Sequence, residues 1–254
     1  MGIPMSLHLP EHRGPAASDP GAARAAADAG FAVLRAAEAR FSRWIPASEL
    51  SRLRSLGART GAGTRIEGAT PSPQMCEVLE IGRWAHEASG GAFDLTGPDG
   101  LLDTDGVVKG WAAQRAAEAV LSAGVTDLCL NAGGDVVVHG EPEPGRPWTV
   151  AIRHPADPRR VVATVSLTDG ALATSGTGER GAHIWDGRTG RPAAHALGSV
   201  TVVASGLTTA DVLATAAFAL GPQGADWAVA HGASWALALA PDGSVLTQAG
   251  APGE

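Results

Sequence analysis

The sequence predicts an α+β fold, with a helical N-terminal part followed by a mostly antiparallel sheet with interspersed helices. Over roughly the first 90 residues, apolar residues recur at three- and four-residue steps, which is the period of an amphipathic helix. Beyond about residue 125, apolar residues alternate with polar ones or form β-branched runs between turns, as strands do. Helices first and strands later are typical of the α+β class.

The size of the chain sets the number of domains to expect. It has 254 residues, of which 44% are hydrophobic and 18% are charged. This is enough to bury a sizeable core, and it lies near the upper limit of one compact domain. We therefore expect residues 1–254 to form one domain, or two closely packed lobes.

The first part of the chain predicts three helices. A loop rich in Pro, Gly and Ala precedes a helix over about residues 22–44, whose apolar side chains share one face and which Pro46 ends. Residues 48–56 fit a second, short helix. The Gly-rich segment GARTGAGTRIEGATP then serves as a linker to a third helix over about residues 73–89, which ends at a Gly-Gly pair.

The middle of the chain changes from helices to strands. The loop GAFDLTGPDG leads to a short strand around Leu101 and Leu102, and a helix is expected over about residues 109–123, ended by Gly124. Five strands follow, the first two joined by an Ala-Gly-Gly turn. They are expected at residues 127–131, 135–139, 148–153, 161–167 and 198–204.

The last part of the chain predicts two more helices and a hairpin. Thr208 or Thr209 is expected to cap a helix over about residues 210–220, which a Gly-Pro pair ends. Another short helix is expected near residues 225–230. The chain then turns in a hairpin at the Pro-Asp-Gly sequence of residues 241–243.

The composition argues against several classes of protein. With a net charge of -7 and arginines scattered among acidic residues, there is no basic stripe for phosphates, so nucleic acid is not expected as a partner. Cys76 and Cys129 form no CxxC motif, so neither a metal cluster nor a disulfide framework is predicted, and both are expected to be buried and reduced. The start MGIPMSLHL lacks the features of a secretory signal, and no segment predicts a membrane span, so a cytoplasmic location is expected.

The segment TADVLATAA contains a pair of oxygen-bearing side chains. Asp211 and Thr215 are four residues apart, so on a helix both lie on one face. Such a pair suits Mg²⁺, which typically takes one or two protein oxygens and completes its shell with water and phosphates. The spacing also fits a structural role, in which Asp211 favours the helix dipole and Thr215 bonds back to the preceding turn.

Lys109 is the only lysine in the chain, and it lies in the segment LLDTDGVVKGWAAQRAAE. There an acidic turn leads through Gly106 into a helix. Backbone N–H groups at a helix start, together with an ammonium group, would form a seat for a diphosphate. The alternative is that Lys109 is a solvated residue at the start of its helix.

Three further segments suit a ligand. In GAFDLTGPDG small residues allow close backbone approach, Phe93 can cover a flat ring and Asp94 can accept hydrogen bonds, although a helix stop followed by a capping Asp fits equally well. NAGGD forms a tight turn with or without a ligand. LATSGTGERGAHIWDGRTGRPA is Gly-rich and carries His183 and Asp186, and a lone His is more often structural than catalytic.

The order of the motifs resembles that of the FAD:protein FMN transferase family, also called the ApbE-type flavin transferases. The start MGIPMSLHL is similar to the family's MGT segment, and FSRWIPASELSRL resembles STYxPxSELSRxN. GGAFDLT matches GGAFDPT, LDTDGVVKGWA is similar to IDLGGIAKGYA, and NAGGDV matches NLGGDI. ATSGTGERGAHIWDGRTGRPA resembles an ATSG block and HIIDPRTGRP, and SVTVVASGLTTADVLATAAFALGP is similar to SVTVVAPTAMLADALATALFVLGP. Seven collinear segments make the resemblance specific.

The resemblance implies an ApbE-like fold and a Mg²⁺-dependent transferase that moves the FMN half of FAD onto a Thr or Ser hydroxyl of an acceptor protein and releases AMP. Mg²⁺ would be held by the side chains of Asp211 and Thr215 and by the backbone carbonyl of Gly106, and would bridge the FAD diphosphate. The residues implied to contact FAD are Met1, Trp44 (where the family usually has Tyr), Ala92, Phe93, Asp94, Asp103, Lys109 and Ile184.

The resemblance also implies the catalytic residues. His183 matches the His of the HIIDP block and would assist the incoming hydroxyl, the alternative being an acidic residue near the metal. Lys109 and Asp211 complete the catalytic set, because charge neutralisation and alignment would supply most of the catalysis.

The chain departs from the family pattern at further positions. It lacks a few dozen residues between GAFDLT and LLDTDG, Asp105 replaces the first Gly of the LGG turn, Arg54 replaces an Asn, and Gly187 replaces the Pro of the HIIDP block. Asp105 brings a carboxylate close to the expected diphosphate seat, where it would repel the phosphates or help to hold the cation. Two alternatives therefore stay open: an FAD pyrophosphatase that releases FMN and AMP, and a degenerate, non-catalytic FAD-binding protein.

Overall fold

The computed structural model describes residues 2–10, 19–58, 70–178, 181, 183–193 and 195–251. Its helices are α1 (Pro20–Phe41), α2 (Glu49–Ser55), α3 (Pro73–Ala88), α4 (Asp105–Ser122), α5 (Leu207–Leu220) and α6 (Gly224–Ala230). Its strands are β1 (Met5–His8), β2 (Leu128–Ala132), β3 (Asp135–His139), β4 (Trp148–His154), β5 (Asp157–Leu167), β6 (Gly170–Gly176), β7 (Trp185–Asp186), β8 (Arg191–Pro192), β9 (Ser199–Ala204), β10 (Trp235–Leu239) and β11 (Val245–Gly250).

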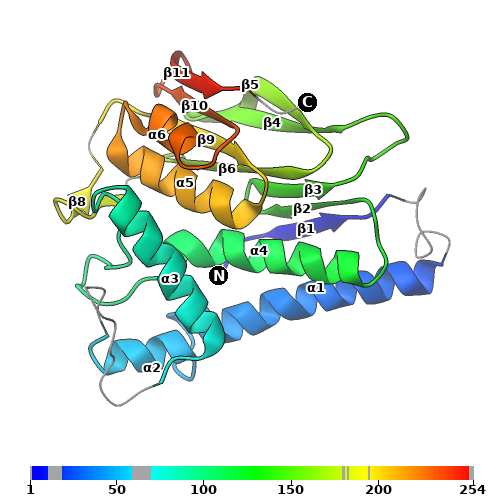
Figure 1. Ribbon diagram of the computed structural model, residues 1–254, viewed down its shortest axis with the longest axis horizontal. Coiled ribbons are helices and arrows are strands. Elements are labelled where there is room, and N and C mark those ends of the chain that lie inside the picture. Colours follow the sequence, from blue (N-terminus) through cyan, green and yellow to red (C-terminus); the bar gives the residue numbers. More distant parts are fainter. Residues whose placement is uncertain are drawn as a thin grey trace.

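The central element is a seven-stranded sheet with the order β1-β2-β3-β6-β9-β10-β11. All neighbouring strands of this sheet are antiparallel. The helices lie on one side of the sheet, and the long β4–β5 hairpin lies on the other (Figure 1). This arrangement confirms the predicted α+β class.

The strands bury side chains on both faces because each face is covered. Val200 and Val202 of β9 belong to the large core under the helices, whereas Val203 belongs to a second core under the β4–β5 hairpin. Successive side chains of a strand point to opposite faces, so one strand serves both cores. The continuous β-branched run that predicted this strand is the pattern of a strand buried on both sides.

Helix α4 runs through the middle of the helical layer, between α1 and α5 (Figure 1). Its inner positions are small, and Ala112, Ala113, Ala116 and Ala117 have no exposed surface. At Gly110 the backbone of α5 comes so close that an added Cβ would lie 2.6 Å from the Leu207 carbonyl oxygen and 2.7 Å from Asp211 Cβ. The small residues of α4 therefore set the close crossing of α4 and α5.

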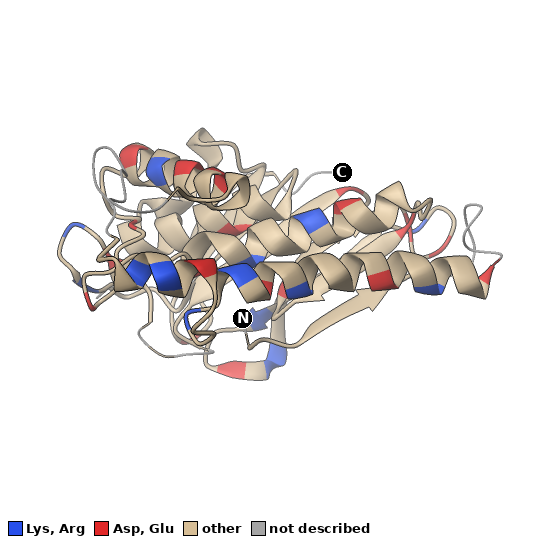
Figure 2. Ribbon diagram, turned by 90° about the horizontal axis from the view of Figure 1, so that it is seen from below, with Lys and Arg blue, Asp and Glu red and all other residues tan. Residues whose placement is uncertain are grey.

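Charged residues of both signs are interspersed on the helical side of the molecule (Figure 2). Along α1, for example, Arg24 pairs with Asp28 at 3.3 Å. Within the described part of the chain, no helix has both the length and the apolar character needed to cross a membrane.

Most predicted elements are present, but several boundaries are wrong. Helix α4 begins at Asp105, so Lys109 lies one turn inside the helix and not at its start. The expected strand at Leu101 and Leu102 is a single bridge between Thr96 and Leu102. The reason is that the loop closes on itself, since the Asp103 N–H donates to the Leu95 carbonyl at 2.7 Å.

Three other predictions need correction or comment. Gly206, and neither Thr208 nor Thr209, is the N-cap of α5, and the Gln114 side chain accepts the Leu207 N–H at 2.8 Å. Strand β6 was missed, because its sequence GALATSG consists mainly of small residues and has glycines at both ends, as loops often do. Most of the predicted Gly-rich linker, residues 59–69, lies outside the described residues.

The two cysteines differ in exposure, which corrects the expectation that both are buried. Cys76 is exposed on α3, and Cys129 is partly buried on β2. Burial raises the pKa of the Cys129 thiol to about 11, which suppresses its reactive thiolate form.

We predict that a maleimide at pH 7.5 labels Cys76 of the folded chain and leaves Cys129 unlabelled until denaturant is added. Peptide mapping by mass spectrometry checks this, and equal labelling of both thiols in the native protein would contradict it.

Candidate functional site

An ion-pair cluster of two buried acids and one lysine that is 28% exposed lies where α4, α5 and the start of β3 meet. Lys109 Nζ is 2.5 Å from Asp135 Oδ2 and 3.2 Å from Asp211 Oδ1. Both carboxylate residues are only 2% exposed. The single lysine is therefore a partner of two buried acids, and its alternative description as a solvated residue is wrong.

Asp135 reaches the cluster because of the tight turn before it. Gly133 and Gly134 have φ values of +65° and +102°, which glycine adopts readily, and they join Ala132 to Asp135 in a two-residue hairpin. The other carboxylate oxygen of Asp135, Oδ1, accepts the backbone N–H of Thr174 at 2.9 Å. Asp135 is thus fixed between its own hairpin and strand β6.

Asp211 reaches the cluster from α5. Its Oδ2 accepts the Gly110 backbone N–H at 2.8 Å, which the close helix crossing makes possible. One turn further along α5, Thr215 Oγ1 lies 3.1 Å from Ser175 Oγ of β6. The predicted pair, Asp211 and Thr215, therefore faces α4 and the sheet.

Gly106 lies beside the same pair. A Cβ built on Gly106 would lie 3.8 Å from Thr215 Cγ2 and 3.1 Å from the ring of Phe93. The structure therefore brings together Gly106, Lys109, Asp211 and Thr215 from two helices. Asp135 and Ser175 join this group without having been predicted as site residues. NAGGD did contain Asp135, but the motif indicated only a turn.

The electrostatics of the cluster are set by burial and by its unequal charges. Burial by itself lowers the pKa of Lys109, but the carboxylates of Asp211 and Asp135 outweigh this and raise it. Burial raises the pKa of Asp211 to about 7, although Lys109 opposes the shift. With both acids ionised, two carboxylates and one ammonium give a net charge of -1. A further cation is therefore favoured beside this cluster.

The side chains at this position suit a hard cation such as Mg²⁺, because Asp211 offers a carboxylate and Thr215 a hydroxyl, and the backbone of Gly106 lies next to Thr215. Among the described residues, no group of three or more His, Cys, Asp or Glu side chains is placed to hold a metal. A metal bound at this site would consequently use hydroxyl or carbonyl oxygens in addition to carboxylates, as the predicted set of Asp211, Thr215 and Gly106 does.

The residues implied to contact FAD differ widely in exposure. Ala92, Phe93 and Ile184 are buried, whereas Trp44 is 82% exposed. The Phe93 ring packs against Gly106, directly beside the Thr215 side chain. Met1 lies outside the described residues.

The two predicted acidic contacts are held by local hydrogen bonds. Asp94 Oδ1 accepts the Thr96 N–H at 2.7 Å, and its Oδ2 lies 3.4 Å from Nδ1 of His86. Asp103 Oδ1 accepts the Asp105 N–H at 3.0 Å. Both carboxylates are thereby oriented on the loop that leads from α3 to α4.

His183 is exposed, and its Nδ1 lies 3.0 Å from the carbonyl oxygen of Gly181. A carbonyl only accepts, so Nδ1 is the donor of this hydrogen bond. Among the described contacts, none joins His183 to Lys109, Asp211 or Thr215. The role of His183 stays a prediction.

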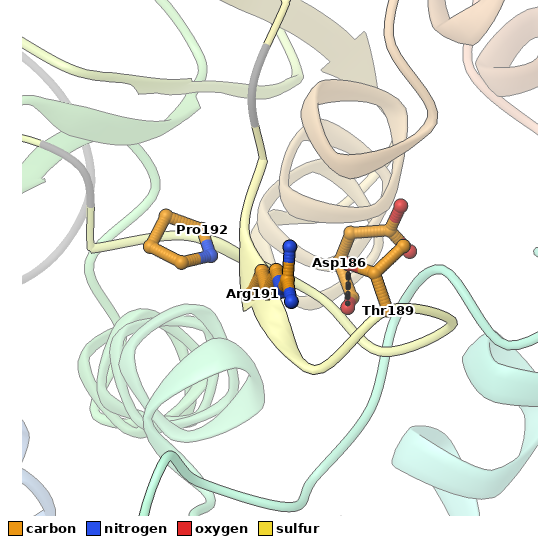
Figure 3. A pocket seen from close by; sticks show the side chains of 4 residues that line it. All are labelled: Asp186, Thr189, Arg191 and Pro192. Atoms are coloured by element: carbon orange, nitrogen blue, oxygen red, sulfur yellow. Dashed lines mark hydrogen bonds between the residues drawn. The ribbon is translucent and has the colours of Figure 1, made fainter.

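A hollow of about 490 Å³ lies on the segment that follows His183 and Ile184. Its lining residues come from the β7–β8 hairpin and are Asp186, Thr189, Arg191 and Pro192 (Figure 3). The Thr189 hydroxyl donates to the Asp186 carbonyl at 3.2 Å and holds the turn closed. The hollow does not include the Lys109 cluster.

Comparison with known proteins decides the family. The model of the ApbE family matches residues 1–99 and 96–237. The chain belongs to the ApbE family. The match confirms the resemblance found in the motifs.

The curated relatives of this ApbE-family chain are named FAD:protein FMN transferase. The relative from Klebsiella pneumoniae (strain 342) is 35% identical over 141 residues, which are 52% of this chain and 40% of that protein. The relative from Rhodobacter capsulatus is 39% identical over 157 residues, which are 57% of this chain and 29% of that protein. The matches thus span less than half of the length of these relatives.

Solved structures of ApbE proteins share the fold. The Flavin Transferase ApbE from Vibrio cholerae aligns with a TM-score of 0.78 and 23% identity, covering 98% of this chain and 94% of the other. The ApbE protein of Thermotoga maritima aligns with a TM-score of 0.74 and 22% identity, covering 96% of each chain. At these identities the likeness establishes the fold.

The departures from the ApbE pattern have local structural partners. Arg54 donates from Nη1 to the Leu102 carbonyl at 2.5 Å and also pairs with Asp99, so it braces the shortened loop. Gly187 packs against Gly91 and donates its N–H to the Ala92 carbonyl at 3.0 Å. A proline at this position would lose that hydrogen bond.

The close helix crossing leads to a prediction for Gly110→Ala. The added methyl group meets the Leu207 carbonyl and Asp211 Cβ, so we expect the variant to lose about 1–3 kcal/mol of unfolding free energy. Gly to Ala inside a helix normally gains stability, by about 1 kcal/mol. Thermal denaturation measures the change, and an unchanged or higher Tm would show that α4 and α5 are not in close contact at this position.

The ion-pair cluster leads to a prediction for Lys109→Met. Removing the ammonium leaves two buried carboxylates without their counter-charge, which costs about 3–5 kcal/mol of unfolding free energy. Burial raises the pKa of Asp211, so protonation relieves part of this cost: the loss is largest above pH 7 and shrinks as the pH falls. Urea denaturation without metal, at pH 8.5 and at pH 5.5, measures the loss of unfolding free energy at each pH.

A control for Lys109→Met is Arg115→Met on the same helix. Arg115 pairs with Glu77 at the surface, where both side chains are about two-fifths exposed. Losing this surface ion pair is expected to lower the free energy of unfolding by less than about 1 kcal/mol. The cluster would be refuted as a buried ion-pair site if Lys109→Met were as mild as this control at pH 8.5.

Proposed function

We propose that this chain is an FAD:protein FMN transferase, which moves the FMN moiety of FAD onto a Thr or Ser hydroxyl of an acceptor protein with release of AMP. The observation that carries the proposal is the buried Lys109–Asp135–Asp211 cluster with the Thr215 hydroxyl and Gly106 beside it. Membership of the ApbE family and the names of the curated relatives support it.

The proposed Mg²⁺ site consists of Asp211, Thr215 and the carbonyl oxygen of Gly106. Its support is the hard-oxygen donor set and the net charge of -1 in the adjoining cluster. Mg²⁺ bound there would neutralise charge on the FAD diphosphate and polarise its P–O bonds. Asp135 would act through Lys109, because its carboxylate holds the ammonium in place from the sheet side.

FAD is the proposed substrate, with Lys109 near its diphosphate. Phe93 and Ala92 would form one wall of the binding site together with Ile184, and Trp44 would offer an exposed ring for stacking. Asp94 and Asp103 would accept hydrogen bonds from FAD. The site draws on α4, α5 and the α1–α2 turn, so we propose that the chain acts as a single flavin transferase domain.

The proposed reaction is a displacement at phosphorus. The acceptor oxygen forms a new bond to the phosphorus on the FMN side, the bond from that phosphorus to the bridging oxygen breaks, and AMP leaves. The hydroxyl proton passes to Nε2 of His183, the ring nitrogen that the contact with Gly181 leaves available. Alignment of the hydroxyl and charge neutralisation by Lys109 supply the main part of the rate enhancement.

The test is transfer itself, with FAD, MgCl₂ and a peptide library that presents single Thr or Ser residues. We expect peptides to gain the mass of FMN, one AMP to form per adduct, and EDTA to abolish the reaction. Asp211→Ala should lower the rate at least about 100-fold, as loss of a group that positions transition-state charge does. Asp226→Ala, which removes an exposed aspartate of α6, is the matched control and should keep the wild-type rate.

Other product patterns would replace the proposal. FMN and AMP without an adduct on any peptide would indicate an FAD pyrophosphatase, in which water takes the place of the hydroxyl. FAD that binds but stays intact with Mg²⁺ would indicate a non-catalytic flavin-binding protein. Full activity in EDTA would refute the metal site.

A further inference from the structure

We infer that Arg43 is a positioning residue, which neutralises the carboxylates of Asp103 and Asp105 at the mouth of the proposed FAD site and so permits the diphosphate to bind. This inference rests on the proposed function. Arg43 Nη1 lies 3.0 Å from Asp103 Oδ2, and Arg43 Nη2 lies 2.9 Å from Asp105 Oδ2. One guanidinium thus bridges two acids on either side of Thr104.

The two acids that Arg43 bridges lie next to the proposed diphosphate site. Asp105 is the first residue of α4, directly before Gly106, and Asp103 is one of the predicted FAD contacts. Their carboxylates and that of Asp211 are all on or next to the two helices of the site. With Arg43, the pair of acids and the guanidinium sum to -1, and without Arg43 they sum to -2. A diphosphate approaching the start of α4 would meet this added negative charge.

The turn that carries Arg43 is itself held in place. The Ser48 hydroxyl donates to the Ser42 carbonyl at 2.7 Å, and the Ser51 hydroxyl donates to the Arg43 carbonyl at 3.4 Å. The guanidinium carbon also lies 5.5 Å from the centre of the Trp44 ring, within the range of a cation–π contact. Arg43 therefore connects Trp44 and Asp103, two predicted FAD contacts from different parts of the chain.

Arg43 and Asp105 both differ from the family pattern, and they contact each other. Arg43 occupies the position of the Thr in STYxPxSELSRxN, and Asp105 occupies the position of a Gly in IDLGGIAKGYA. An acid added at the start of α4 is thus matched by a base added in the α1–α2 turn. The pairing explains how this chain tolerates a carboxylate next to the proposed diphosphate seat.

The test is a double-mutant cycle on FAD binding, with intrinsic tryptophan fluorescence as the probe and EDTA present to prevent turnover. Arg43→Ala should weaken FAD binding roughly fivefold, as expected for the loss of one partly exposed charge pair near a charged ligand. The same substitution made in Asp105→Gly should have a clearly smaller effect, since one of the two acids is then absent. Arg43→Lys should retain most of the affinity.

Two further readouts separate this role from a structural one. The effect of Arg43→Ala should shrink as NaCl is raised, because a charge effect is screened and a packing effect is not. Arg24→Ala is the matched control: it removes an arginine from another acid pair, near the start of α1 and about five helical turns before Arg43, and should leave FAD binding unchanged. Thermal denaturation of each variant confirms folding.

Each outcome bears on the inference. Equal loss of affinity from Arg43→Ala in both backgrounds, or no loss at all while the wild type binds FAD, would overturn it and leave the proposed function standing. A wild-type chain that binds FAD neither in EDTA nor with MgCl₂ would overturn both. A loss that depends on Asp105 and on salt, and that Arg43→Lys avoids, establishes Arg43 as the neutralising residue.

Discussion

The contact on which the site depends is the ion pair of Lys109 with Asp135 and Asp211. Each of the three residues belongs to a different element, and each carboxylate has a second partner that fixes its direction, Thr174 for Asp135 and Gly110 for Asp211. Leaving any one of these charges buried and alone would cost several kcal/mol, in the range of about 3–5. The cluster therefore fixes the position of α4 and α5 over the inner strands β3 and β6, and with it the position of Gly106 and Thr215.

This placement requires small residues, and it carries a stability cost. Gly106 and Gly110 lie in the first two turns of α4, where each glycine disfavours the helix by about 1 kcal/mol relative to alanine. The Ala-rich remainder of α4 offsets the loss, because it packs without exposed surface between α1 and α5. Helix α4 is thus locally less stable where α5 and Phe93 approach it, and its packed alanines offset this along the rest of the helix.

The sequence alone was informative wherever local patterns decide structure. The 3.6-residue period of α1 and the Gly-Gly turn before Asp135 were both readable, as was the Asp211–Thr215 pair. Two kinds of feature could not be predicted from the sequence alone. Strand β6 is made a strand by its neighbours β3 and β9, since its own residues are mostly small and carry little strand preference. The contacts of Asp135 with Lys109, and of Arg43 with Asp105, join residues 26 and 62 positions apart, which no local pattern encodes.

The charge distribution also indicates how a nucleotide and a metal would enter such a site. The Lys109 cluster sums to -1, and the Arg43 bridge with its two acids sums to -1 as well. A diphosphate approaching alone meets net negative charge from both groups, although Lys109 attracts it at short range. A divalent cation approaching alone is favoured by both groups. In the proposed site, the cation and the diphosphate would neutralise each other, and Asp211, Thr215 and the Gly106 carbonyl would hold them. If FAD binds as proposed, its affinity and that of Mg²⁺ are therefore coupled, and the buried acids are the physical reason for the coupling.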